Sequence, residues 1–141
     1  MKWEEVLYKI EIMHKFFPNQ PKEIENGNKE YKWKLSPIKY NKNTNKKKFN
    51  KIIKYKCEKL ASQMHWRCCE GNGNAVYILG IEDDGNPVGI KKYDMFKTLL
   101  FIIKASTIIH ATINKIRLYK GPNGTIATVR ISLNIEETKT L

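Results

Sequence analysis

The spacing of apolar residues along this chain predicts five strands. Residues 125–135 alternate most regularly, so one face of this strand should pack while the other meets water. Residues 29–35 and 112–119 are also predicted as strands. Residues 75–81 are apolar on both parities, which is typical of a strand covered on both faces. In residues 125–135 the inward set is Ala127, Val129, Ile131, Leu133 and Ile135, and the outward set is Thr128, Arg130, Ser132 and Asn134.

Helical spacing predicts three helices, over residues 1–17, 51–70 and 94–110. The middle helix should bury one stripe and end at Gly71 and Gly73, because glycine accepts the left-handed backbone found at helix C-termini. Asp94 is the expected N-cap of the third helix. The expected inner faces are Trp3, Val6, Leu7, Ile10, Met13 and Phe17; Ile53, Cys57, Leu60 and Met64; and Met95, Leu99, Ile102, Ile103, Ser106 and Ile109.

Two tight turns make part of the sheet antiparallel. Asp84-Gly85 predicts a two-residue hairpin whose return strand begins at Val88 and Ile90, and a second turn falls at residues 121–124. The resulting class is α+β, a two-layer fold with about five mostly antiparallel strands and three helices mainly on one face. We expect an N-terminal helix and loop over 1–28, an α+β domain over 29–136 and a polar tail over 137–141.

Positive charge is concentrated in one segment. The 141 residues carry a net charge of +12, and residues 29–56, with eleven lysines and one acid, contribute +10 of it. The Lys/Asn-rich insertion at 38–50 lacks periodicity and is expected to be disordered or mobile. The positive charge is explained by nucleic-acid binding. It is equally explained by the codon bias of an AT-rich genome, because lysine outnumbers arginine 23 to 3.

The chain offers little enzymatic chemistry. It lacks the G-x-x-x-x-G-K-[ST] loop that cradles nucleotide phosphates, so neither GTP nor another cofactor is expected to bind. His65, Cys68 and Cys69 do not have structural zinc spacing, and Cys57 and Cys68 are interpreted as core residues with Cys69 incidental. Glu82, Asp83 and Asp84 are interpreted as a soluble turn rather than a metal site. We therefore expect no enzyme activity and no metal.

Two features of the sequence indicate where in the cell the protein is located. No apolar run approaches the ~20 residues needed to span a membrane, and an odd number of cysteines does not make a secreted disulfide framework. A reducing, cytoplasmic location is expected.

Basic and aromatic residues are the candidates for a nucleic-acid contact. Trp66 could stack on a base and Arg67 could contact phosphate, although Trp66 could instead pack against Trp33 or the first helix. Lysines supply nonspecific attraction to phosphates. The candidate set is Lys46, Lys47, Lys48, Lys51, Lys54, Trp66 and Arg67.

The chain also resembles a known family from about Glu25 to Ile109. The residues that carry the resemblance are Glu25-Asn26-Gly27-Asn28, Glu30-Tyr31-Lys32, Gln63-Met64, Trp66-Arg67, Glu70-Gly71, Gly73, Ala75-Val76-Tyr77, Gly80, Glu82-Asp83, Gly85 and Val88-Gly89. They are similar to the region ahead of the G domain in eukaryotic elongation-factor-like GTP-binding proteins, the GTP-binding protein 1 and 2 group. His65, Asn72 and Cys68-Cys69 depart from the pattern of that group and remove positive charge from the helix end.

The resemblance implies a non-catalytic N-terminal accessory domain. Its partners would be a GTPase module, the ribosome or RNA in the cytoplasm, and GTP and Mg²⁺ would be bound by downstream sequence. Two alternatives stay open. One is a stand-alone basic RNA- or nucleic-acid-binding domain. The other is an AlbA-like domain of the Schlafen type, whose metal-dependent cleavage would require Glu82 and Asp83.

Overall fold

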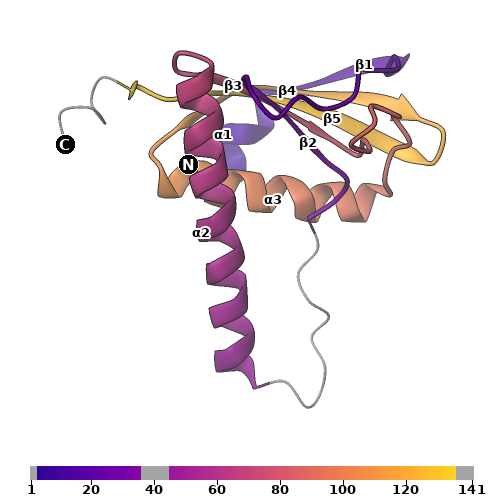
Figure 1. The fold of residues 1–141 in the computed structure, drawn as a ribbon. Helices are drawn as coiled ribbons and strands as arrows, with labels where there is room; N and C mark the ends of the chain where they lie inside the picture. The colour runs from indigo at the N-terminus through magenta and orange to yellow at the C-terminus, as the bar shows by residue number, and fades with distance from the viewer. Residues whose placement is uncertain (1–2, 36–44, 136–141) are drawn as a thin grey trace.

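The protein forms a five-stranded mixed sheet with its helices on one face. The computed structural model describes residues 3–35 and 45–135 (Figure 1). The strand order is β1-β4-β5-β3-β2, which confirms the predicted α+β class. The elements are α1 (Trp3–Leu7), β1 (Ile10–Phe16), β2 (Lys29–Lys32), α2 (Lys46–Glu70), β3 (Asn74–Leu79), α3 (Lys92–Ile108), β4 (Thr112–Gly121) and β5 (Gly124–Ser132).

The sheet is antiparallel at its centre and parallel at both sides. β5 pairs antiparallel with β4 through the tight turn at 121–124 and antiparallel with β3 on its other side. β1 runs parallel to β4, and β2 runs parallel to β3. The two outer pairs were not expected, because a parallel pair joins segments that are distant in sequence and leaves no turn signal between them.

Two hydrophobic clusters lie on opposite faces of the sheet. The alternation in β5 sends Ala127, Val129 and Ile131 into the larger cluster, where they meet α1, α2 and α3. This confirms the inward set predicted for this strand. A smaller cluster on the other face contains Tyr31, Ile78, Ile81 and Ile126, with Phe17, Val76 and Tyr119 packed against it.

The prediction of one helix over residues 1–17 was wrong. α1 ends at Leu7, and β1 follows as an outer strand whose Ile10 and Ile12 lie beside Ile116 and Leu118 of β4. Apolar residues at 3, 6, 7 and 10 fit a helix, but those at 10 and 12 also fit a strand, and pairing with β4 decides between them. The register of β1 shifts between Ile12 and Phe16, where His14 has a left-handed φ of 53°.

Helix α2 begins earlier than predicted. Asn45 caps it, since its side chain accepts a hydrogen bond from Lys47 N at 2.9 Å, so residues 46–50 are helical rather than part of a mobile insertion. Residues 38–44 of that insertion, and the polar tail at 137–141, lie outside the described residues. At the other end Gly71 N and Gly73 N donate to carbonyls of the last turn, and Gly73 has the predicted left-handed φ, 96°.

The buried stripe of α2 is confirmed from Cys57 onward. Cys57, Leu60 and Met64 are buried, whereas Ile53 is only half-buried. Figure 1 shows why: the N-terminal half of α2 extends away from the sheet and from α3. Most of the basic residues of this helix therefore lie on a part of the molecule that other elements do not cover.

Three further expectations needed correction. The turn at 82–86 forms, but residues 88–90 do not return alongside β3, because β5 already occupies that edge; Ile90 makes an isolated bridge to Thr125. Asp94 lies in the first turn of α3 and Lys91 precedes the helix, without a side-chain cap bond. β2 ends at Lys32, and Trp33, expected to pack, is 40% exposed.

A buried hydroxyl fixes the chain that leaves β2. Thr98 of α3 is fully buried, accepts a hydrogen bond from Leu35 N at 3.0 Å and donates one to the carbonyl of Asp94 at 2.8 Å. We expect Thr98→Val to lower the free energy of unfolding by about 1–3 kcal/mol, because it leaves the partly buried amide of Leu35 without its acceptor. Chemical denaturation measures this. Thr107→Val is the matched control, since the Thr107 hydroxyl bonds a carbonyl of its own helix; equal losses in the two variants would contradict the assignment.

Candidate functional site

Arg67, predicted as a phosphate contact, is buried in a network of its own. Only 3% of its surface is exposed, and its Nε lies 2.6 Å from Oε2 of Glu30 in β2. Nη1 donates to the carbonyls of Asn26 and Gly27, and Nη2 donates to the carbonyl of Ile24. One guanidinium thus joins α2, β2 and the chain that precedes β2, and its donors are directed at protein groups rather than at the surface where a phosphate contact was predicted.

The carboxylates around Arg67 take part in the same packing. Glu30 is 5% exposed and also lies 3.4 Å from Lys32 Nζ. Glu23 accepts a hydrogen bond from Tyr31 N on the outer side of β2. Burial raises the pKa of the Glu23 carboxyl, against the lowering effect of that hydrogen bond. The cluster is built to hold segments together.

Trp66 stacks against its neighbour. The guanidinium carbon of Arg67 lies 4.8 Å from the centre of the Trp66 ring, and the Trp66 side chain remains 44% exposed. The partner of this ring is therefore Arg67, a contact that the sequence analysis did not consider. Trp66 keeps enough exposed surface to meet a ligand.

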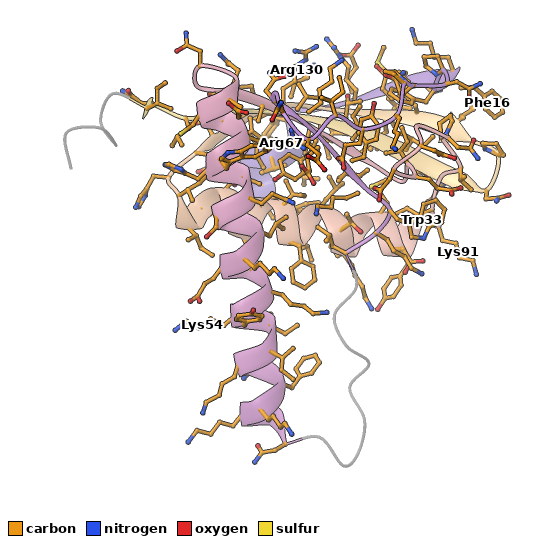
Figure 2. All side chains as sticks on the ribbon, viewed as in Figure 1. Phe16, Trp33, Lys54, Arg67, Lys91 and Arg130 are labelled. Atoms are coloured by element: carbon orange, nitrogen blue, oxygen red, sulfur yellow. The ribbon has the colours of Figure 1, made fainter. Side chains whose placement is uncertain are left out.

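The predicted lysines lie on a different part of α2. Lys46, Lys47, Lys48, Lys51 and Lys54 are all exposed along its projecting half (Figure 2, where Lys54 and Arg67 are labelled). Lys54 and Trp66 are twelve residues apart, or about 18 Å along a helix. The structure therefore does not bring the predicted set together as one site.

A groove between these two regions was missed. It has a volume of about 590 Å³ and lies between α2, the end of β2 and α3. Leu35, Ile52, Leu60 and Phe101 supply apolar lining, and Tyr55 and Gln63 add polar groups. Four lysines also line it: Lys32, Lys34, Lys56 and Lys59. The sequence shows Tyr55 and Lys59 on one side of a helix, but not that Lys32 and Lys34 face them.

The cysteines behave as a core pair and one surface thiol. Cys57 and Cys68 are buried, and Cys69 is exposed with its Sγ 3.7 Å from Nδ1 of His65. Burial raises the pKa of the Cys57 thiol and raises that of Cys68 to about 11. Within residues 3–35 and 45–135, no three His, Cys, Asp or Glu side chains are grouped so that they could hold a metal ion.

The acidic turn has a structural role, as predicted. Asp84 Oδ1 accepts a hydrogen bond from Asn86 N at 2.9 Å, and the carbonyl of Asp83 accepts one from Glu23 N at 2.8 Å. Gly85 has a φ of 93°, and a Cβ there would lie 2.0 Å from the carbonyl oxygen of Gln20. The turn therefore packs backbone to backbone against the chain that follows β1, and glycine is required for that approach.

Comparison with known proteins gives three informative matches. GTP-binding protein 2 from Mus musculus and from Homo sapiens are each 36% identical to this chain over 101 residues, 71% of the chain. The chain is therefore related to GTP-binding protein 2. Uncharacterized protein R625 of Acanthamoeba polyphaga mimivirus is 31% identical over 85 residues, 60% of this chain and 45% of that protein.

The relationship covers a small part of the relative. The matched segment is 14% of the length of GTP-binding protein 2. No family model matches the chain, and no solved structure matches it. None of the helices in the described part of the chain is long and apolar enough to cross a membrane.

The Arg67 network predicts a large stability effect. Arg67→Gln leaves the Glu30 carboxylate buried without its main partner, and we expect it to lower the free energy of unfolding by about 3–5 kcal/mol. Arg130→Gln, which removes the same charge from an exposed position of β5, should change it by less than about 0.5 kcal/mol. Adding Glu30→Gln to Arg67→Gln should recover part of the loss. If urea denaturation shows similar losses of unfolding free energy for Arg67→Gln and Arg130→Gln, Arg67 does not stabilise the fold through its buried contacts.

The cysteine environments predict one reactive thiol. Cys69 should react quickly with a thiol reagent such as DTNB, while Cys57 and Cys68 should react only after unfolding, because they are buried and their thiol pKa values are raised. Cys69→Ser should remove the fast phase of the reaction and leave the slow one. A second fast thiol in the native protein would contradict the burial of Cys57 or Cys68.

Proposed function

We propose that this chain is a non-catalytic accessory domain of the kind that precedes the G domain in elongation-factor-like GTP-binding proteins. The observation that carries the proposal is the 36% identity to GTP-binding protein 2 over 101 residues. The residues that carry the resemblance include Glu30 and Arg67 of the buried network and Glu82-Asp83 and Gly85 of the acidic turn. These residues hold the fold together, which is what a shared domain would retain.

The sequence supports the proposal that nucleotide binding belongs to a GTPase module and not to this segment. Gly80 and Gly85 have the glycine spacing of a phosphate loop, but Asn86-Pro87 follows where Lys-[Ser/Thr] is required. Gly85 is also committed to its contact with Gln20. In this proposal GTP and Mg²⁺ are bound by a GTPase module, in the same polypeptide or a separate one, and the complex meets ribosomes or RNA in the cytoplasm.

The AlbA-like alternative receives less support. It needs Glu82 and Asp83 as part of a metal-dependent nuclease, yet this segment is held by backbone bonds to Gln20 and Glu23. A turn packed in this way serves the fold. The basic alternative depends on the lysines of α2.

Partnership with a GTPase can be tested by titration. The chain is titrated calorimetrically into a GTPase region of human GTP-binding protein 2 that lacks the matched segment, loaded with GDP or a non-hydrolysable GTP analogue. We expect saturable binding, and GTP turnover only in samples that contain the GTPase region.

Two results would overturn the proposal. One is hydrolysis of GTP by the chain alone, and the other is the absence of binding to the GTPase region in either nucleotide state. The titration is repeated at about 0.5 M salt, because the net charge of +12 attracts acidic surfaces nonspecifically and salt screens that attraction.

A further inference from the structure

We propose that the groove between α2 and the end of β2 binds single-stranded nucleic acid. In this proposal the groove lysines pair with phosphates and Tyr55 stacks on a base. The proposal goes beyond an accessory role and does not depend on a GTPase partner. It also centres the contact surface on Tyr55, Lys56 and Lys59 rather than on Arg67 or on the predicted Lys51 and Lys54.

The shape and lining of the groove suit a nucleotide. Its volume of about 590 Å³ falls in the range of pockets that take small organic ligands. Leu35, Ile52 and Phe101 offer apolar surface to a base or a ribose. Tyr55 is 64% exposed at the groove, so one ring is available for stacking without rearrangement of the core.

The charge of the groove fits a phosphate chain. Lys34, Lys56 and Lys59 are exposed, and no acidic residue is among the described residues that line the groove. Lys32 is shared with Glu30, at 3.4 Å, and so contributes less. Lysine ammonium groups bind phosphates as mobile point charges, which matches a flexible single strand.

Aromatic and basic residues alternate along the same side of α2. Lys48, Tyr55, Lys59 and Trp66 are separated by seven, four and seven residues, so they share one side of the helix over about 27 Å. Tyr55 and Trp66 both expose their rings. Positive charge that tracks a backbone, interleaved with rings that accept any base, is the combination that single-strand binders use.

An acidic protein segment is the competing occupant of the groove. Such a segment would use the apolar lining and the nearest lysines, but it would leave the rest of the row without a partner. Lys32, Lys34, Lys56 and Lys59 line the groove, and Lys48 continues the row on the same side of α2. A ligand with a charge on every unit fits that helix better than one with a few scattered carboxylates.

The test compares matched pairs of lysine substitutions. Binding of a fluorescent 12-nucleotide oligouridylate is followed by fluorescence polarisation, with oligo-dT, a duplex and a poly-glutamate peptide in parallel arms. Lys56→Gln/Lys59→Gln removes groove charge. Lys51→Gln/Lys54→Gln removes equal charge from the same helix, and Lys54 lines a separate hollow with Ile53 and Cys57.

We expect the groove pair to weaken oligonucleotide binding much more than the control pair. It should also reduce the slope of log K against log salt by about 1.4, since each phosphate contact on a single strand contributes about 0.7. Tyr55→Ala should weaken binding by at least about five-fold and Tyr55→Phe should restore it, because stacking needs only the ring. Thermal melting checks that each variant is folded.

Several outcomes would overturn the inference. Equal losses from the two lysine pairs would mean diffuse attraction along α2. If Tyr55→Ala does not change oligonucleotide binding, Tyr55 does not stack on a base. If the protein binds no oligonucleotide, the groove is not a nucleic-acid site. If Tyr55→Ala and Lys56→Gln/Lys59→Gln weaken the binding of poly-glutamate but not that of the oligonucleotides, the groove binds an acidic protein segment instead. Comparison of oligouridylate with oligo-dT shows whether the groove prefers single-stranded RNA or single-stranded DNA.

Discussion

The fold depends on burying one guanidinium with all of its partners in place. A buried charge is costly unless it is paired and its remaining donors are satisfied. Arg67 meets that condition only when β2 brings Glu30 and the preceding chain brings the carbonyls of Ile24, Asn26 and Gly27. The last turns of α2, the outer strand β2 and the chain before it are therefore coupled, and they should form or be lost together.

This coupling also explains the two characters of α2. Its C-terminal half is anchored by Arg67, Cys68 and Met64, while its N-terminal half projects from the body as Figure 1 shows. A helix fixed at one end can present a row of side chains in constant orientation without burying them. The anchoring that withdraws Arg67 from ligand contact is thus the feature that positions Tyr55 and the lysines near it.

The sequence predicted the elements whose pattern is local. The five predicted inward residues from Ala127 to Ile135 alternate without a break, and the turn at Asp84-Gly85 is specified by its own residues. β1 was missed because Ile10 fits both a helical and a strand spacing, and the deciding partner, Ile116, lies more than a hundred residues away. The same limit hid the site: Glu30 is 37 residues from Arg67, so an exposed and a buried arginine look identical in sequence.

Each margin of the sheet carries a feature that hinders the addition of a further strand. On one side the left-handed His14 interrupts the regular backbone of β1, and on the other the Glu23 carboxylate occupies the outward amide of Tyr31 in β2. Unprotected margins recruit other chains into continuous cross-β stacks. Such interruptions are one means by which a sheet that exposes apolar side chains, here Ile12 and Phe16, limits edge-to-edge association.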